Sequence, residues 1–302
     1  MYCPEWNLLN LSMVFGAITG SIAVITREFS PSTRLNYSKF NTASSTGASG
    51  MSISSFNGML LIYSPSLIVS ILFFIWSIND YRMLMISAAI FAHYLKRVLE
   101  VVFIHRYSGQ SKLKDNTLIS TFYFSFTSFI YKMSLHVPES DSKLALCGVA
   151  MFILGEYTNF YHHLLLRQLR KDGSKEYKIP SGGLFDYVWC PHYLGEIISF
   201  VAMVLLTQHI LILILQLGSA GYLATRAYNT KKCSSDTYDT KHEAILPLID
   251  HLWILKFHLN KESHDEMRRI NGACFDSALK LHFPLAKQGN QKEVDVILPI
   301  AD

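Results

Sequence analysis

The sequence predicts an all-α integral membrane protein, a bundle of about seven transmembrane helices followed by a polar C-terminal tail. Half of the 302 residues are apolar and only 17% are charged, whereas a soluble domain usually carries about 25% charged residues. Seven apolar stretches approach or exceed the roughly 20 residues that span a bilayer. Residues 229–302 hold 21 charged side chains in 74 positions, and residues 1–228 hold only 29.

The chain therefore divides into a membrane domain, residues 1–228, and a divergent polar tail, residues 229–302. The first apolar stretch is not expected to be a signal peptide, because Glu5 precedes it and no Lys or Arg does. The seven expected spans are Leu8–Ile25, Gly58–Ile78, Tyr81–Ile104, Thr117–Val137, Leu144–Leu166, Tyr187–Thr207 and His209–Tyr228.

Loop charge predicts the orientation of these spans. The first, third and fifth loops carry eleven Lys and Arg residues in all, and the second, fourth and sixth carry three. Cytoplasmic loops are the ones enriched in Lys and Arg. An odd number of spans then places the N-terminus outside the cytosol and the tail inside it.

Composition also excludes other classes of protein. The net charge of +4 is too small and too scattered for a nucleic-acid-binding surface. The five cysteines stand far apart without a CxxC pair, so we expect free thiols and neither a disulfide framework nor a zinc site. Cys190 and His192 lie close in sequence, but two ligands do not make a metal site, and we expect no metal.

Polar residues within apolar stretches are candidates for function, because burying them in a membrane is costly. The first group ends the third stretch: His93, Arg97 and Glu100 fall on one helix face, with Tyr94 beside them. The simpler alternative is a helix end whose basic side chains reach the lipid headgroups. That alternative leaves His93 and Tyr94 unexplained, and the apolar run that follows suggests that the group faces inward.

The second group lies near the end of the fifth stretch. Asn159, His163, Arg167 and Arg170 fall within an arc of roughly 80° on one helix face. A stripe from amide through imidazole to two guanidinium groups suits an elongated ligand with a polar end and several phosphates. The alternative is a cytosolic stop signal in which His163 is a buried core residue.

The third group is a turn with Pro180, Gly182 and Gly183, followed by His192 and Glu196. Backbone amides of a Gly-Gly turn can approach a phosphate closely, but the turn alone is weak evidence and a plain loop explains it better. Neither a P-loop nor a GxGxxG motif is present, so neither soluble nucleotide-binding fold is supported.

In order and spacing, residues 159–170, 177–185 and 190–197 resemble the steroid 5-alpha-reductase family. His93-Tyr94 with Arg97 resembles an earlier motif of that family, and residues 96–109 are similar to its plant-type branch, close to trans-2-enoyl-CoA reductases. The resemblance covers about residues 35–228, with the family's C-terminal signature at about 145–228. It implies a seven-helix membrane reductase of the endoplasmic reticulum, in steroid or very-long-chain fatty acid metabolism.

The resemblance also implies the chemistry and the residues that carry it. NADPH would reduce a carbon–carbon double bond conjugated to the carbonyl of a lipid, an enoyl-CoA or a 3-oxo-Δ4-steroid. Tyr94 would lie at the substrate carbonyl, with Arg97 or His93 assisting it, and a phenol donor there would stabilise the developing enolate. The nucleotide-site residues would be Asn159, His163, Arg167, Arg170, His192, Glu196 and Arg226.

Two departures from the family pattern keep alternatives open. The steroid enzymes pair their tyrosine with a glutamate from an earlier helix, but residues 57–65 hold no carboxylate. After Arg226 the family's Trp-Tyr pair is absent, and the charged tail follows. The main alternative is therefore a non-catalytic membrane protein that lost cofactor binding through its altered end. A narrower 3-oxo-Δ4-steroid reductase, and a transporter or channel, are the others. The sequence leaves the oligomeric state open.

Overall fold

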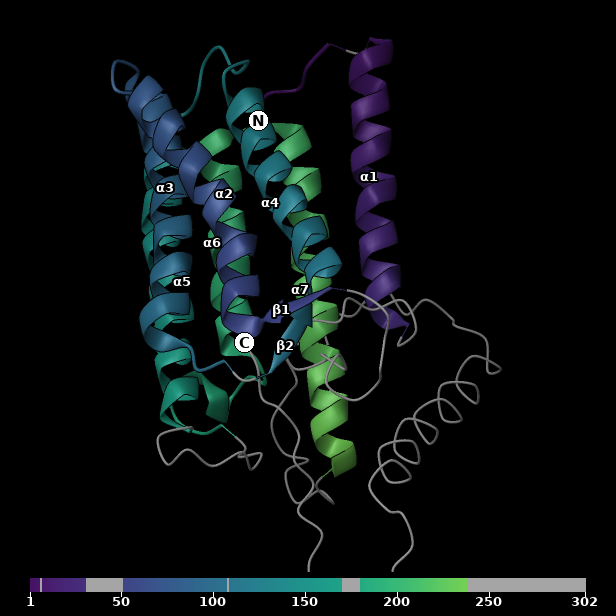
Figure 1. The fold of residues 1–302 in the computed structure, drawn as a ribbon. Coiled ribbons are helices and arrows are strands. Elements are labelled where there is room, and N and C mark those ends of the chain that lie inside the picture. Colours follow the sequence, from purple (N-terminus) through teal and green to yellow (C-terminus); the bar gives the residue numbers. More distant parts are fainter. Residues whose placement is uncertain (6, 31–50, 108, 170–179, 238–302) are drawn as a thin grey trace, which may run out of the picture. The chain divides into compact units, whose positions relative to one another are not determined.

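Seven α-helices make up most of the chain that the computed structural model describes, residues 1–5, 7–30, 51–107, 109–169 and 180–237 (Figure 1). The predicted all-α class is confirmed, since the only sheet among these residues has two short strands. The helices are α1 (Leu8–Phe29), α2 (Ser55–Trp76), α3 (Tyr81–Leu99), α4 (Leu113–Ser134), α5 (Ser142–Gln168), α6 (Pro191–Thr207) and α7 (Ile210–Thr237).

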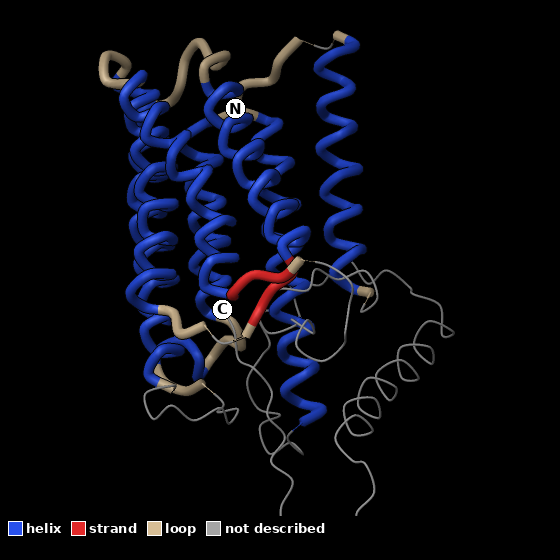
Figure 2. Tube along the Cα trace, in the orientation of Figure 1, coloured by secondary structure: helices blue, strands red, loops and turns tan. Residues whose placement is uncertain are grey.

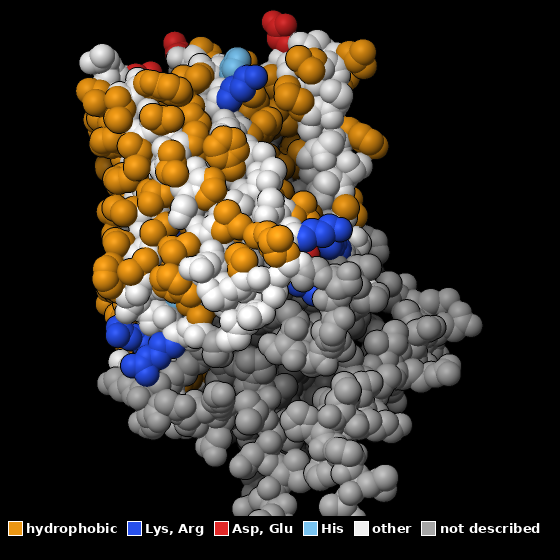
Figure 3. Space-filling view, in the orientation of Figure 1, with side chains coloured by type: hydrophobic (Ala, Val, Ile, Leu, Met, Phe, Trp, Pro, Cys, Tyr) orange, Lys and Arg blue, Asp and Glu red, His pale blue; other side chains and the backbone are white. Residues whose placement is uncertain are grey.

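The outer surface of these helices is apolar, as a membrane protein requires. Among the described residues four helices, α1, α2, α5 and α7, are long and apolar enough to cross a membrane, and α6 is apolar but has only 17 residues. On the side of the molecule that Figure 3 shows, hydrophobic side chains are spread over the helices. On α1, for example, Phe15 is 70% exposed and Ile22 is 56% exposed. In lipid such side chains need no protein partner.

The sixth and seventh helices differ from the stretches that hydropathy predicts. α6 begins at Pro191 and not at Tyr187, because a short 3₁₀ turn, η3 (Gly183–Asp186), precedes it and proline favours the first position of a helix. α7 continues past Tyr228 to Thr237.

The third stretch ends in a widened turn. α3 passes into a π-helical segment, η2 (Glu100–Ile104), in which the His105 N–H donates to the Glu100 carbonyl at 2.8 Å. Such a turn changes the direction of the side chains that follow it, and π-helical turns are frequent at functional sites.

A small antiparallel ribbon joins the beginnings of α2 and α4 (Figure 2). Its strands are β1 (Ser52–Ser54) and β2 (Gln110–Lys112), with Ile53 opposite Ser111. Hydropathy does not signal it, because the strands are short and polar.

Close helix packing brings the polar residues of the bundle together. A Cβ atom on Gly155 of α5 would lie 2.5 Å from the Ser199 Oγ of α6, and one on Gly195 would lie 2.5 Å from the Asn159 backbone nitrogen. Only glycine fits at these two positions, so α5 and α6 approach closely and Asn159 lies against α6.

A polar contact also joins α2 to α4. Pro65 lacks the N–H that would donate to the Leu61 carbonyl one turn earlier. Ser120 of α4 donates to that carbonyl at 2.7 Å. The backbone group that the proline leaves unpaired inside the bundle is therefore satisfied by the neighbouring helix.

Candidate active site

Seven polar side chains from α3, η2, α5 and α6 meet inside the bundle. We call them the buried ionic cluster: Lys96, Arg97, Glu100, Glu156, Asn159, His163 and His192. Glu100 is only 1% exposed, and Asn159 and His163 are each 2% exposed. Charged groups this deep in an apolar bundle are stable only when they are paired.

Glu100 is the centre of one half of the cluster. Its Oε2 lies 3.0 Å from the Arg97 Nη1, and its Oε1 lies 3.1 Å from the His163 Nδ1. The Lys96 Nζ is 3.6 Å from the same Oε1. One carboxylate thus faces two cationic side chains and an imidazole.

Glu156 of α5 is the centre of the other half. Its Oε1 lies 2.8 Å from the His93 Nδ1, and its Oε2 lies 2.9 Å from the Lys96 Nζ. Lys96 also donates to the Asn159 Oδ1. The Asn159 Nδ2 donates to the His192 carbonyl at 2.9 Å, which connects α3, α5 and α6.

The guanidinium group of Arg97 has a further partner in α2. The Arg97 Nη2 donates to the Tyr63 hydroxyl at 2.6 Å, and the guanidinium carbon lies 4.8 Å from the centre of the Tyr63 ring. Tyr63 belongs to residues 57–65, the α2 segment that holds no carboxylate. From this helix Arg97 is therefore contacted by a phenol and not by a carboxylate.

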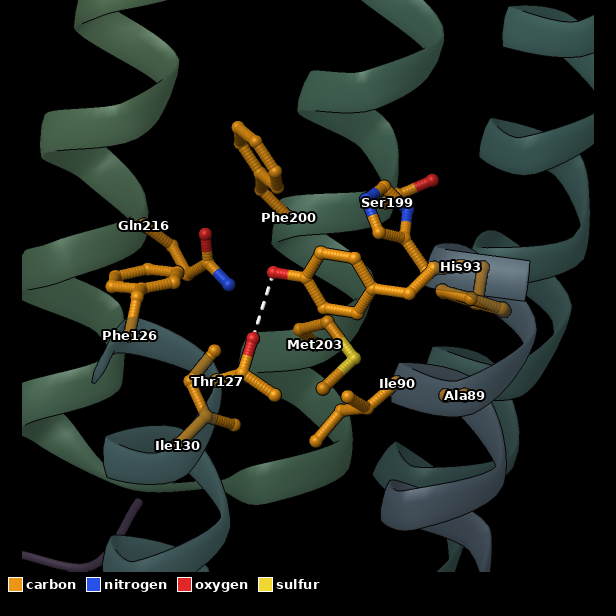
Figure 4. A pocket seen from close by; sticks show the side chains of 12 residues that line it. Ala89, Ile90, His93, Phe126, Thr127, Ile130, Ser199, Phe200, Met203 and Gln216 are labelled. Atoms are coloured by element: carbon orange, nitrogen blue, oxygen red, sulfur yellow. Dashed lines mark hydrogen bonds between the residues drawn. The ribbon is translucent and has the colours of Figure 1, made fainter. Parts of the chain in front are cut away.

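Tyr94 lies at a different place on α3, in a pocket of about 60 Å³ (Figure 4). The Thr127 hydroxyl of α4 donates to the Tyr94 phenol oxygen at 2.7 Å, the dashed line in Figure 4. His93 also lines this pocket, and its ring contacts Glu156 of the buried ionic cluster. The apolar side chains that line it are Ala89, Ile90, Phe126, Ile130, Phe152, Phe200 and Met203.

The predicted nucleotide-site residues do not all come together. Asn159, His163 and His192 lie in the buried ionic cluster, and Glu196 is half-buried one turn after His192 on α6. Arg167 is exposed near the end of α5. Arg170 lies outside the described residues.

Arg226 of α7 contacts α1. Its Nη1 lies 3.3 Å from the Glu28 Oε1 and donates to the Tyr222 hydroxyl at 3.1 Å, and both charged side chains are 1% exposed. The Asn229 Nδ2 donates to the Glu28 carbonyl at 3.0 Å. These contacts hold α1 against α7, and a role for Arg226 toward a nucleotide stays a prediction.

One set of potential metal ligands is present among the described residues. Glu100, His105 and His163 offer ligand atoms within 4.8 Å of one another. Lys96 and Arg97 already face the Glu100 carboxylate, however, and a divalent cation beside it would be repelled by both. The arrangement fits ion pairing better than metal binding. Cys190, the cysteine considered above, is buried and belongs to no disulfide among the described residues.

Several residues of the site were missed by the reading of the sequence. Glu156 pairs with His93 and Lys96, Tyr63 pairs with Arg97, and Thr127 and Gln216 line the pocket of Tyr94. A signal did exist for Glu156 and Gln216, because each is a polar residue within an otherwise apolar stretch.

Comparison with known proteins supports one family. The model of the family described as 3-oxo-5-alpha-steroid 4-dehydrogenase matches residues 79–253. A very-long-chain enoyl-CoA reductase of Dictyostelium discoideum is 31% identical over 164 residues, 52% of this chain and 55% of the relative. The human 3-oxo-5-alpha-steroid 4-dehydrogenase 2 is 37% identical over 113 residues, 36% of this chain and 44% of the relative. The chain spans about half the length of the curated relatives it matches.

Proposed function

Because the chain belongs to the 3-oxo-5-alpha-steroid 4-dehydrogenase family, we propose that it reduces a carbon–carbon double bond conjugated to a carbonyl in a lipid, using NADPH. The substrate is of the enoyl-CoA or the 3-oxo-Δ4-steroid type. One observation carries the proposal: the Tyr94 hydroxyl lies in a largely apolar pocket, on the same helix as Lys96 and Arg97 of the buried ionic cluster.

The buried ionic cluster has features that fit a polar cofactor. The His192 Nδ1 is buried and has no hydrogen-bond partner among the described residues, and it lies beside the Asn159 that contacts the His192 backbone. Asn159, His163, His192 and Glu196 would hold the nicotinamide end, and Arg167 and Arg170 would hold the phosphates. NADPH supplies the hydride when it is bound.

The protein's own part in the reaction is to position the lipid carbonyl and to stabilise negative charge on its oxygen. Since Thr127 donates to the Tyr94 oxygen, the phenol proton is available to the substrate. Hydride addition at the β-carbon builds charge on the carbonyl oxygen, so the hydrogen bond from Tyr94 strengthens as the transition state forms. A bound lipid against the largely apolar lining would displace water, which would strengthen this interaction further.

The direct test is consumption of NADPH by membranes that contain the full chain. The panel includes trans-2-hexadecenoyl-CoA and cholest-4-en-3-one, and membranes without the protein are the control. We expect reduction of at least one of these lipids. Binding of NADPH without turnover of any conjugated lipid would contradict the proposal, and absence of NADPH binding would favour the non-catalytic alternative.

The phosphate-binding role predicts a loss of affinity in one variant. Arg170→Ala is expected to weaken NADPH binding roughly ten- to a hundredfold, because one charge-assisted hydrogen bond contributes about 1.5–3 kcal/mol. Titration of the purified protein with NADPH measures this. The control is Lys132→Ala, in the last turn of α4 and outside the proposed nucleotide site. This variant should bind NADPH as the wild type does. Unchanged affinity in the Arg170 variant would remove this residue from the site.

The location proposed for the chain is the endoplasmic reticulum membrane, with a lumenal N-terminus and a cytosolic tail. The bias of Lys and Arg toward the odd-numbered loops supports this orientation. Protease added to sealed microsomes should remove an epitope placed at the C-terminus and leave one placed at the N-terminus. Protection of the C-terminal epitope would reverse the orientation.

A further inference from the structure

Gln216 is a buried polar residue that the proposed function does not yet use. It follows six apolar residues at the start of α7 and is 4% exposed. Its Oε1 is buried and has no hydrogen-bond partner among the described residues. Most buried polar groups are paired, so a buried carboxamide whose oxygen is unpaired in a transmembrane helix marks a polar position that the described residues do not fill.

The pocket of Tyr94 gives a polar partner a place. Gln216 lines this pocket, and Figure 4 shows its carboxamide pointing into it, toward the hydrogen bond between Thr127 and Tyr94. The other polar side chains of the lining are engaged within the protein. His93 contacts Glu156 at 2.8 Å, and Ser199 donates to the Gly195 carbonyl at 3.2 Å.

We propose that Gln216 is a second hydrogen-bonding group for the carbonyl of the substrate. Figure 4 shows the carboxamide nitrogen on the side of the hydrogen bond between Thr127 and Tyr94, so the N–H2 donor already faces the pocket. Tyr94 then donates to the carbonyl oxygen from α3 and Gln216 donates to it from α7. Two fixed donors at one oxygen favour ligands with a carbonyl at that place and stabilise the charge that reduction builds there.

This inference rests on the proposed function for its substrate class, but binding tests it without turnover. The ligands are trans-2-hexadecenoyl-CoA and S-(trans-2-hexadecenyl)-CoA, which differ only in the carbonyl. Cholest-4-en-3-one and cholest-4-ene form a second pair. Equilibrium binding to the full chain in detergent gives the preference for the carbonyl ligand in each pair.

The test compares Gln216→Met with Ile212→Met, which places the same side chain at a fully buried position of α7 outside the pocket lining. We expect Gln216→Met to reduce the preference for the carbonyl ligand about three- to tenfold, the effect of one neutral hydrogen bond. Ile212→Met should keep the preference of the wild type. Gln216→Leu replaces the methionine variant if that variant does not fold.

The outcomes separate this inference from the proposed function. A wild type that reduces a conjugated lipid, with a Gln216 variant that keeps the full preference for the carbonyl, overturns the inference alone. A wild type without turnover whose carbonyl preference falls in the Gln216 variants contradicts the proposed function and supports the inference. A wild type that binds both members of each pair equally also overturns the inference.

Discussion

Tyr94→Phe is expected to lower kcat for reduction of the conjugated lipid by about 10² to 10³, by analogy with the loss of one oxyanion-stabilising donor. The variant keeps the ring in its 8% exposed position and removes only the hydroxyl that Thr127 contacts. Since the hydroxyl acts mainly as charge develops, the loss should fall on kcat, and NADPH affinity should change little.

Tyr131→Phe is the matched control for this substitution. Tyr131 of α4 is also 8% exposed, and its hydroxyl contacts the Ser77 Oγ at 3.0 Å, away from the lining of the pocket. We expect a change of less than about twofold in kcat, with stability lowered by about 1 kcal/mol at most. If Tyr94→Phe and Tyr131→Phe reduce the lipid equally fast, Tyr94 is not the donor to the carbonyl.

Glu100→Gln is expected to have the largest effect on stability. The substitution removes the charge that faces Arg97, Lys96 and His163 and leaves buried cationic groups without compensation. Breaking a buried ion pair from one side costs about 3–5 kcal/mol. Thermal or denaturant unfolding in detergent, followed by circular dichroism, measures the loss.

Glu139→Gln is the control for the charge change, because Glu139 is exposed in the turn between α4 and α5. We expect a change within about 0.5 kcal/mol for this variant. Equal stability of the two variants would mean that the buried ionic cluster does not depend on Glu100. A second variant, Glu100→Gln with Arg97→Met, should recover part of the loss, since it removes a buried charge that the first variant leaves unpaired.

α3 connects the two parts of the site. His93 and Tyr94 line the pocket, and Lys96, Arg97 and Glu100 follow within two turns in the buried ionic cluster. His93 is common to both parts through its contact with Glu156. A helix that carries residues of both groups fixes the distance between them, and the proposed hydride transfer would depend on such a fixed distance.

Much of the fold and part of the site follow from the sequence alone. The length and apolar composition of the stretches determine the helices, because a bilayer accepts little else. The 3.6-residue period predicts that His93, Arg97 and Glu100 share one helix face and that Asn159 and His163 share another. Arg97, Glu100, Asn159 and His163 meet in the buried ionic cluster, and His93 contacts its Glu156.

Only the tertiary structure decided which side chains pair across helices. Glu156 is 63 residues from His93, and Glu28 is 198 residues from Arg226, yet each pair is in contact. Gln216 and Tyr94 are likewise far apart in the sequence, yet they line the same pocket. Hydropathy gives the length of a helix in lipid but not its rotation about its own axis, because lipid accepts every apolar face equally. Rotation and spacing come from close packing, as at Gly155 and Gly195, and these determine which polar groups meet.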